Sequence, residues 1–170
     1  FGIGFDLSVL YGVDSMRPLE LALENKVIDT FVLASLVHPA PYSYTNRFGR
    51  TVFDGAKPER AKAWLALDEQ AFQLGVQGKF GDLKELAKKH NPPKTKVADL
   101  DFGLIPLDDP EFLEYATYDI ISLRAVYYAL LARLKAQEYS GDYVWREMLV
   151  WSLNAQITRN GVLVNQEEAQ

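Results

Sequence analysis

The chain has 170 residues, of which 48% are hydrophobic and 24% charged, and this is the composition of a folded globular protein rather than of a disordered one. The absence of cysteine excludes disulfides, zinc–thiolate sites and cysteine nucleophiles, and is typical of a cytoplasmic protein. With only His38 and His90 beside 23 acidic residues, a metal site is expected to use carboxylates, which favour Mg²⁺ or Mn²⁺. No apolar run approaches the roughly 18 residues needed to cross a bilayer, so we expect no membrane partner.

The first part of the chain predicts short elements. A brief apolar segment covers residues 5–13. Pro18, at a plausible first helical position, then favours a helix over residues 18–24. Residues 27–29 read as a short strand. Thr30 is then expected to cap a helix that ends before Pro39.

The middle of the chain predicts a loop followed by helices. Residues 39–55 mix aromatic side chains with Pro, Ser, Asn and Gly, which is typical of a loop. A helix is expected over residues 57–74 and is ended by Gly75, and a shorter amphipathic helix over residues 82–90 stops at Asn91.

A long helix is the strongest element of the C-terminal part. Asp108 or Asp109, followed by Pro110, predicts its start, and it is expected to continue to Gln137. A further helix over residues 143–159 and a short strand over residues 162–164 follow. The predicted elements are therefore mostly helical.

Tyr115 and Asp119 lie one turn apart on the long helix, so their side chains share one face. Asp119 fills a gap in the apolar row of that helix. The row contains Phe112, Ala116, Leu123, Tyr127, Leu130 and Leu134. A carboxylate in such a row needs compensation, which a neighbouring amide, an arginine or a bound cation can supply.

The charges are segregated along the sequence. Residues 44–98 hold eleven basic and six acidic side chains, whereas residues 99–119 hold seven acidic side chains and no basic one. This pattern suits a protein that binds phosphates beside a cation-binding centre, and a solvated surface produces similar blocks.

Residues 115–119, YATYD, form a Tyr-x-x-x-Asp motif, and in Phe5-Asp6-Leu7 an aromatic residue precedes an Asp. The first resembles the third exonuclease motif, and Phe5-Asp6-Leu7 the second, of the DEDD 3′–5′ exonucleases of the tyrosine subclass, which include the proofreading domain of family A DNA polymerases. Residues 81–87 resemble a helix of the same family. The closing residues 153–165 look like the junction that enters the polymerase region, and phage-type family A polymerases fit best.

The resemblance implies an α/β, ribonuclease H-like fold, represented here mainly by its helical part. Residues 1–138 would form the 3′–5′ exonuclease domain without its N-terminal strands, and residues 139–170 the lead-in to a polymerase domain. The implied activity is two-metal hydrolysis of 3′-terminal phosphodiester bonds in proofreading. The implied partners are the single-stranded 3′ end of DNA and the nucleoside monophosphate product.

The same resemblance assigns the site residues. Asp6 and Asp119 would be metal ligands for two Mg²⁺ or Mn²⁺ ions, about 4 Å apart, of which one activates water and the other stabilises the leaving oxygen. Tyr115 would orient the attacking water by hydrogen bonding.

Two departures from the family pattern affect this assignment. The Asp-x-Glu strand of the first motif is expected upstream of Asp6, so this stretch alone is expected to be inactive. Asp109-Pro110-Glu111 has the right letters, but its proline favours a helix start over a strand. Gly2 stands where the family usually has Asn.

Two other functions stay open at this point. One is a ribonuclease D-like enzyme that trims RNA, and the other is a non-catalytic exonuclease-like module that braces a polymerase or binds DNA. The aromatic side chains of residues 42–53, interleaved with Arg47 and Arg50, are suited either to stacking on bases or to ordinary loop packing. His90 is expected to be a helix-end residue rather than a ligand.

Overall fold

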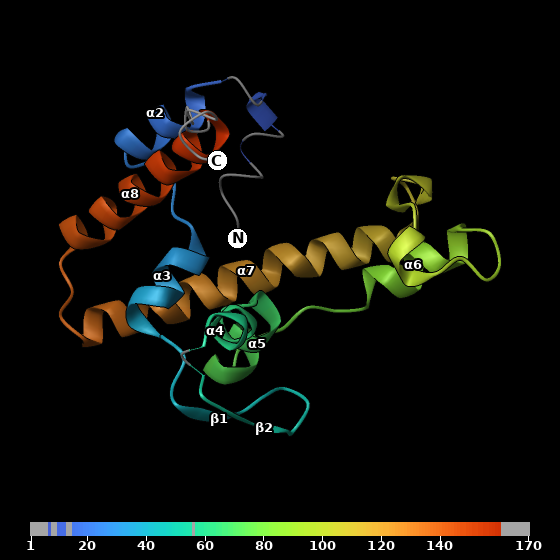
Figure 1. The fold of residues 1–170 in the computed structure, drawn as a ribbon, viewed down its shortest axis with the longest axis horizontal. Helices are drawn as coiled ribbons and strands as arrows, with labels where there is room; N and C mark the ends of the chain where they lie inside the picture. The colour runs from blue at the N-terminus through green and yellow to red at the C-terminus, as the bar shows by residue number, and fades with distance from the viewer. Residues whose placement is uncertain (1–6, 8–9, 13–14, 56, 161–170) are drawn as a thin grey trace, which may run out of the picture. The chain divides into compact units, whose positions relative to one another are not determined.

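A computed structural model describes residues 7, 10–12, 15–55 and 57–160 of the chain. Contacts divide the chain into two units, each of which is compact (Figure 1). The terminal unit contains Phe1–Pro39 and Leu130–Gln170, and the central unit contains Ala40–Ala129. The predicted metal ligand Asp6, Gly2 and the predicted strand over residues 162–164 lie outside the described residues.

The terminal unit is helical. Helices α2 (Arg17–Leu23) and α3 (Thr30–Val37) both contact the long helix α8 (Gly141–Asn160), and the last turns of α7 (Pro110–Ala136) complete the unit. The amide of Gln137 donates to the carbonyl of Val37 at 3.2 Å, which ties the chain after α7 to the end of α3. The most buried apolar side chains of the terminal unit are Ala22, Leu33, Ala34, Val37, Leu130 and Met148.

The start of α3 differs from the prediction. Residues 27–29 form no strand, and Asp29 rather than Thr30 is the N-cap, with Oδ1 accepting a 2.8 Å hydrogen bond from the backbone N–H of Phe31. Its extended φ of −88° lets the short side chain reach the second helical residue. The Asp29 N–H also donates to Sδ of Met148 at 3.3 Å, so the cap is fixed against α8.

The central unit begins with a β-hairpin where the sequence predicted a loop. Strands β1 (Ser43–Thr45) and β2 (Thr51–Phe53) pair antiparallel, with Tyr44 opposite Val52. Tyr44 is buried and meets the ring of Trp64 edge-on, with the ring centroids 4.6 Å apart. The hairpin is therefore anchored through its inner face.

The predicted helix over residues 57–74 is two helices, α4 (Pro58–Trp64) and α5 (Leu67–Leu74). The helical conformation is interrupted at Ala66, whose backbone is extended with ψ 141°. The side chain of Gln70 donates to the carbonyl of Trp64 at 2.9 Å and so satisfies one of the backbone groups that the break exposes. Gly75 ends α5 in the left-handed region (φ 67°), as the sequence predicted.

Helix α6 (Leu83–His90) is capped by Asp82, whose Oδ1 accepts from the N–H of Lys84 at 2.8 Å. Two short 3₁₀ turns, η1 (Val97–Asp99) and η2 (Phe102–Leu104), lead from α6 to α7. A small core holds α6, the 3₁₀ segment and the first turns of α7 together, which positions the part of α7 that carries Tyr115. This core consists of Leu86, Ala87, Leu100 and Ile105, with Leu83 and Phe112 packed against them.

The described residues are thus mostly helical, with a sheet of two strands. The ribonuclease H-like assignment and the domain boundary at residue 138 stay predictions. In the part of the chain that the structure describes, no helix combines the length and the apolar character required to cross a membrane.

Candidate functional site

Tyr115 and Asp119 meet a lysine that the sequence analysis did not single out. Nζ of Lys79 lies 2.9 Å from Oδ1 of Asp119 and 5.6 Å from the ring centroid of Tyr115. All three residues belong to the central unit. The phenol and the carboxylate therefore share the ammonium group of Lys79, which lies in the loop between α5 and α6.

The loop between α5 and α6 brings Lys79 to this position. It leaves α5 at Gly75 and reaches α6 after Gly81, and both glycines have a positive φ, 67° and 79°. The loop runs close to α7, because a Cβ added to Gly81 would stand 4.0 Å from the Tyr115 ring. The ring of Phe80 lies 5.1 Å from the ring of Tyr118. The two residues that follow Lys79 thus both lie against aromatic rings of α7, which holds the backbone of Lys79 near the helix.

Burial makes the ion pair significant. The side chains of Lys79 and Asp119 are 26% and 32% exposed, and Oδ1 of Asp119 is itself buried. The 2.9 Å contact meets the distance of an ion pair, but Oδ1 receives no hydrogen bond of good geometry. Among the described residues the partner of Asp119 is a lysine, which was not one of the three compensations considered from the sequence.

The protonation states follow from the same contacts. Burial raises the pKa of the Tyr115 phenol, the ammonium of Lys79 lowers it, and the charge of Asp119 raises it again, with a net increase above 10.0. Burial lowers the pKa of Lys79, but contacts with Asp119 and Tyr115 outweigh it and leave the pKa above 10.5. At neutral pH Tyr115 is therefore a hydrogen-bond donor and Lys79 a cation.

A hollow of ≈ 380 Å³ opens beside Tyr115 and Lys79. Three basic side chains line it, Arg47, Lys79 and Lys84, together with Phe102. Two carboxylates also line it: Asp68 forms an ion pair with Arg47 of the same lining, and Asp82 caps α6. Asp119 is not part of its lining. Three basic against two acidic side chains give the lining a net charge of +1, which favours an anionic group such as a phosphate.

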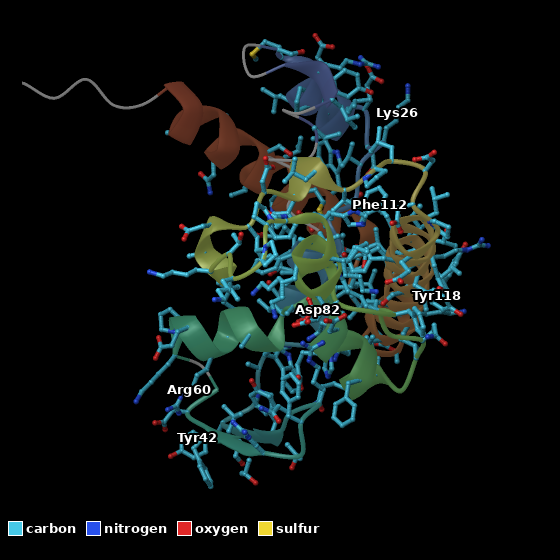
Figure 2. All side chains as sticks on the ribbon, turned by 90° about the vertical axis from the view of Figure 1, so that its right-hand side faces the viewer. Lys26, Tyr42, Arg60, Asp82, Phe112 and Tyr118 are labelled. Carbon is cyan, nitrogen blue, oxygen red and sulfur yellow. The ribbon has the colours of Figure 1, made fainter. Side chains whose placement is uncertain are left out.

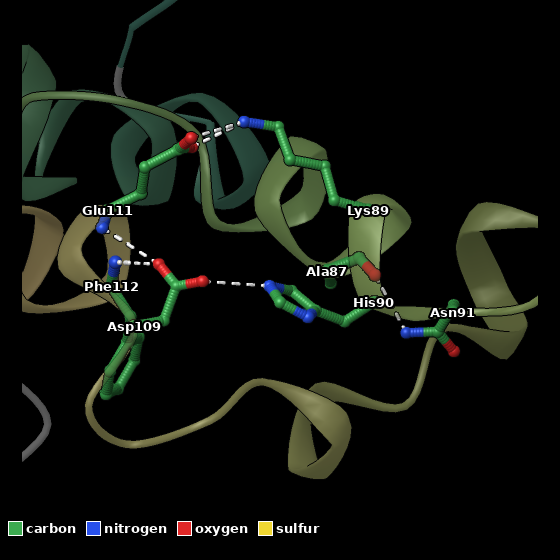
Figure 3. A network of polar contacts seen from close by, with 7 residues as sticks. All are labelled: Ala87, Lys89, His90, Asn91, Asp109, Glu111 and Phe112. Carbon is green, nitrogen blue, oxygen red and sulfur yellow. Dashed lines mark hydrogen bonds and ion pairs between the residues drawn. The ribbon is translucent and has the colours of Figure 1, made fainter.

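A network of polar contacts joins α6 to the start of α7 (Figure 3). Nζ of Lys89 contacts both carboxylate oxygens of Glu111, at 2.7 and 2.5 Å, and Nε2 of His90 lies 3.1 Å from Oδ2 of Asp109. The other oxygen of Asp109 accepts from the N–H groups of Glu111 and Phe112, as an N-cap does.

This network confirms two predictions. The stretch from Asp109 to Glu111 is a helix start, with Pro110 as the first residue of α7, and His90 is the last residue of α6. It also shows how the segregated charges are used. Side chains of the basic segment pair with carboxylates of the acidic segment, as Lys89 does with Glu111 and Lys79 with Asp119.

The oxygen atoms available around Asp119 determine whether the site can bind a divalent cation. Asp119 supplies hard carboxylate oxygens, one of them buried without a well-formed hydrogen bond, which suits a ligand of Mg²⁺ or Mn²⁺. Within the described residues, no three His, Asp or Glu side chains come together in a group that could hold a metal. The described residues thus fit one ligand of such a site, and the predicted second ligand, Asp6, lies outside them.

Lys79 is the residue that sequence reasoning missed. It stands in a loop, outside any periodic pattern, and is one of eleven basic residues in its segment. Its only local signal is its place just before Gly81 and the cap Asp82, and that signal does not point to α7.

Comparison with known proteins gives one similarity. Over 98% of its length the chain is similar to a DNA polymerase of Mycobacterium phage D29, with 28% identity over 171 residues. The chain spans 24% of that polymerase. No family model matches the chain, and no solved structure matches it either. The similarity supports the predicted relationship to a phage DNA polymerase, and the exonuclease assignment stays a prediction.

Proposed function

We propose that this chain is the 3′–5′ exonuclease part of a polymerase-related protein, and that the full-length protein removes 3′-terminal nucleotides from single-stranded DNA. The observation that carries the proposal is the cluster of Tyr115, Asp119 and Lys79 beside a basic hollow. The similarity to a phage DNA polymerase over nearly the whole chain supports it.

In this reaction water attacks the terminal phosphodiester, and the bond from phosphorus to the 3′ oxygen of the penultimate nucleotide breaks. A nucleoside 5′-monophosphate leaves. Tyr115 is neutral and so can hold the attacking water by a hydrogen bond, while the ammonium of Lys79 attracts the charged phosphate. Divalent cations held by Asp119 and further carboxylates would supply activation of the water and stabilisation of the leaving oxygen.

A second candidate function has an observation in its favour. The ion pair with Lys79 neutralises Asp119 without any metal, as a non-catalytic module that only braces a polymerase would require. Such a module would retain the packing of the site, but no trimming activity would depend on the carboxylate of Asp119.

Substitution of Asp119 in the full-length protein separates the two. We expect Asp119→Ala to abolish Mg²⁺-dependent trimming of a 5′-labelled single-stranded DNA and to leave nucleotide incorporation on a primed template unchanged, which serves as the control for folding. Trimming that is equally fast in the variant would refute the exonuclease. Faster trimming of an RNA oligonucleotide than of the DNA would indicate the ribonuclease D-like alternative.

A further inference from the structure

Three aromatic rings in and next to the β-hairpin of the central unit are exposed. Tyr42, Phe48 and Phe53 are 72%, 71% and 58% exposed. Single exposed aromatic side chains are ordinary on a protein surface, but several on one short hairpin mark an interaction surface. This surface, defined by Tyr42, Phe48 and Phe53, is called the aromatic surface below.

The turn of the hairpin is internally braced, so the ring at its tip is presented by an ordered backbone. Oδ1 of Asn46 accepts from the N–H groups of Phe48 and Arg50, at 3.1 and 3.0 Å. The N–H of Asn46 donates to the carbonyl of Arg50 at 2.9 Å, and Gly49 takes the left-handed conformation (φ 73°). A ring presented in this way loses little entropy when it binds a partner.

The inner side of the hairpin is fixed to α5 as well as to Trp64. The side chain of Gln73 donates to the carbonyl of Thr45 at 2.6 Å, and the N–H of Arg47 donates to Glu69 at 3.1 Å. With its inner side held, the hairpin cannot turn the aromatic surface inward without breaking these contacts. The exposed rings are therefore a stable feature of the central unit.

The sequence around the aromatic surface has an excess of basic side chains, some of which are paired, Arg47 with Asp68 and both Lys57 and Arg60 with Asp54. Residues 42–62 contain five basic and two acidic side chains, although the whole chain carries −5. The guanidinium of Arg47 lies over the Phe48 ring, 4.7 Å from its centroid, and no ion pair among the described residues involves the exposed Arg50. Figure 2 shows Tyr42 and Arg60 at the same edge of the structure, beside the hairpin.

Exposed rings beside guanidinium groups match the chemistry of single-stranded nucleic acid. Its bases have open π-faces that stack on aromatic side chains, and its phosphates are attracted by arginine. A duplex does not offer its base faces, and an anionic protein surface does not require stacking. A hollow of ≈ 370 Å³ next to Phe48 is lined by two arginines and two glutamates, Arg47, Arg60, Glu59 and Glu69, so it adds a concavity without a net charge.

We propose that the aromatic surface binds single-stranded nucleic acid, with bases stacked on Tyr42, Phe48 and Phe53 and phosphates beside Arg47 and Arg50. The choice of nucleic acid over other polyanions rests on the proposed function. The contact itself requires neither a metal ion nor hydrolysis.

Photocrosslinking locates the contact in the full-length protein. A single-stranded oligonucleotide with 5-iododeoxyuridine at several positions is bound in EDTA, irradiated and digested, and a matched RNA with 5-iodouridine is treated in parallel. We expect crosslinked peptides from residues 42–53. Crosslinks confined to other parts of the protein overturn the proposal, and the relative yields of the two oligonucleotides distinguish DNA from RNA as the source.

Affinity measurements with matched variants test the role of the rings. Fluorescence anisotropy with labelled oligothymidine, again in EDTA, should show about tenfold weaker binding for Phe48→Leu. Phe72→Leu, which changes a 51% exposed ring on α5, should bind as the parent protein does. Arg50→Ala should reduce the slope of log affinity against log salt by about 0.7. Parental affinity in Phe48→Leu and in the Tyr42→Ala/Phe53→Ala double variant overturns the proposal.

The two proposals fail in different ways. If Asp119→Ala leaves trimming intact while Phe48→Leu weakens binding, the exonuclease assignment fails and the nucleic-acid surface is supported. If Asp119→Ala stops trimming while the hairpin variants bind and crosslink like the parent, the surface proposal fails and the exonuclease is supported.

Discussion

Lys79 and Asp119 form an ion pair at 2.9 Å that joins the loop after α5 to the middle of α7. Both side chains are mostly buried, and the pair lies beside the Tyr115 ring. A partly buried charge that loses its partner is destabilising, because the remaining group is incompletely hydrated and has no counter-ion. Lys79 thus stabilises the local fold and also fixes the charge at the candidate site.

This relationship predicts a coupling between the two residues. Lys79→Met should lower the free energy of unfolding by about 1 kcal/mol, since Asp119 keeps its charge without a partner. The Lys79→Met/Asp119→Asn double variant should lose less than the sum of the single variants, because neither unpaired charge is left. Denaturant unfolding of the four proteins measures the coupling. Lys84→Met, in the same hollow but exposed, is the control and should change stability little. Strict additivity would show that the pair contributes nothing.

The hydroxyl of Tyr115 should matter for hydrolysis and not for folding. Tyr115→Phe keeps the ring beside Gly81 and Lys79 but removes the donor to water, so trimming should fall by roughly 10²-fold while the melting temperature stays the same. Because the pKa of Tyr115 is raised above 10.0, the parent protein should show no loss of trimming from this group between pH 7 and pH 9. Tyr118→Phe, which changes the phenol next to Phe80, is the matched control and should keep parental activity.

The base of the hairpin depends on the absence of a side chain at Gly55. A Cβ at this position would overlap the carbonyl oxygen of Pro41, while the N–H of Gly55 donates to the carbonyl of Tyr42 at 2.9 Å. Gly55→Ala should therefore force the base of the hairpin open and cost about 1–3 kcal/mol of unfolding free energy.

Gly49 supplies the comparison for this prediction. It has open space around it but a φ of 73°, so Gly49→Ala should cost only the strain of the left-handed conformation, about 1 kcal/mol. Thermal or denaturant unfolding ranks the two variants. A Gly55→Ala protein as stable as Gly49→Ala would contradict the close packing at Pro41.

The cap of α7 predicts a dependence of stability on acid pH. Three contacts lower the pKa of Asp109 from 3.8. The backbone N–H of Phe112 has the largest effect, followed by the backbone N–H of Glu111 and the ring of His90. A lowered pKa in the folded state means that the charged form stabilises the fold above pH 3.8, and that this contribution is lost as the pH falls through the lower folded value.

Asp109→Asn tests this dependence, because Asn is also a good N-cap but does not titrate. The melting temperature of the variant should change less between pH 5 and pH 2 than that of the parent protein. Asp108→Asn, next to it and exposed, serves as the control and should keep the parental slope. An unchanged slope in Asp109→Asn would show that the cap does not contribute to acid unfolding.

Local signals in the sequence determined much of the secondary structure. Pro110 after Asp109 marks the start of α7, and Gly75 ends α5 in the left-handed conformation, because each residue restricts its own backbone whatever surrounds it. The spacing of Tyr115 and Asp119 likewise follows from helix geometry alone. Within the loop expected over residues 39–55 the sequence missed two three-residue strands, because their hairpin needs Trp64 and α5 to hold its inner face.

The candidate site divides in the same way between sequence and tertiary structure. Sequence by itself determined that a phenol and a carboxylate share one face of a long helix, since both lie within a single regular element. Only the tertiary structure decided that Lys79 is the partner of Asp119 and that Asn46 braces the turn bearing Phe48. Lys79 acts from a loop, where no periodicity relates a residue to its neighbours in space. The path of that loop depends on packing, such as that of Phe80 against Tyr118, and not on local preference.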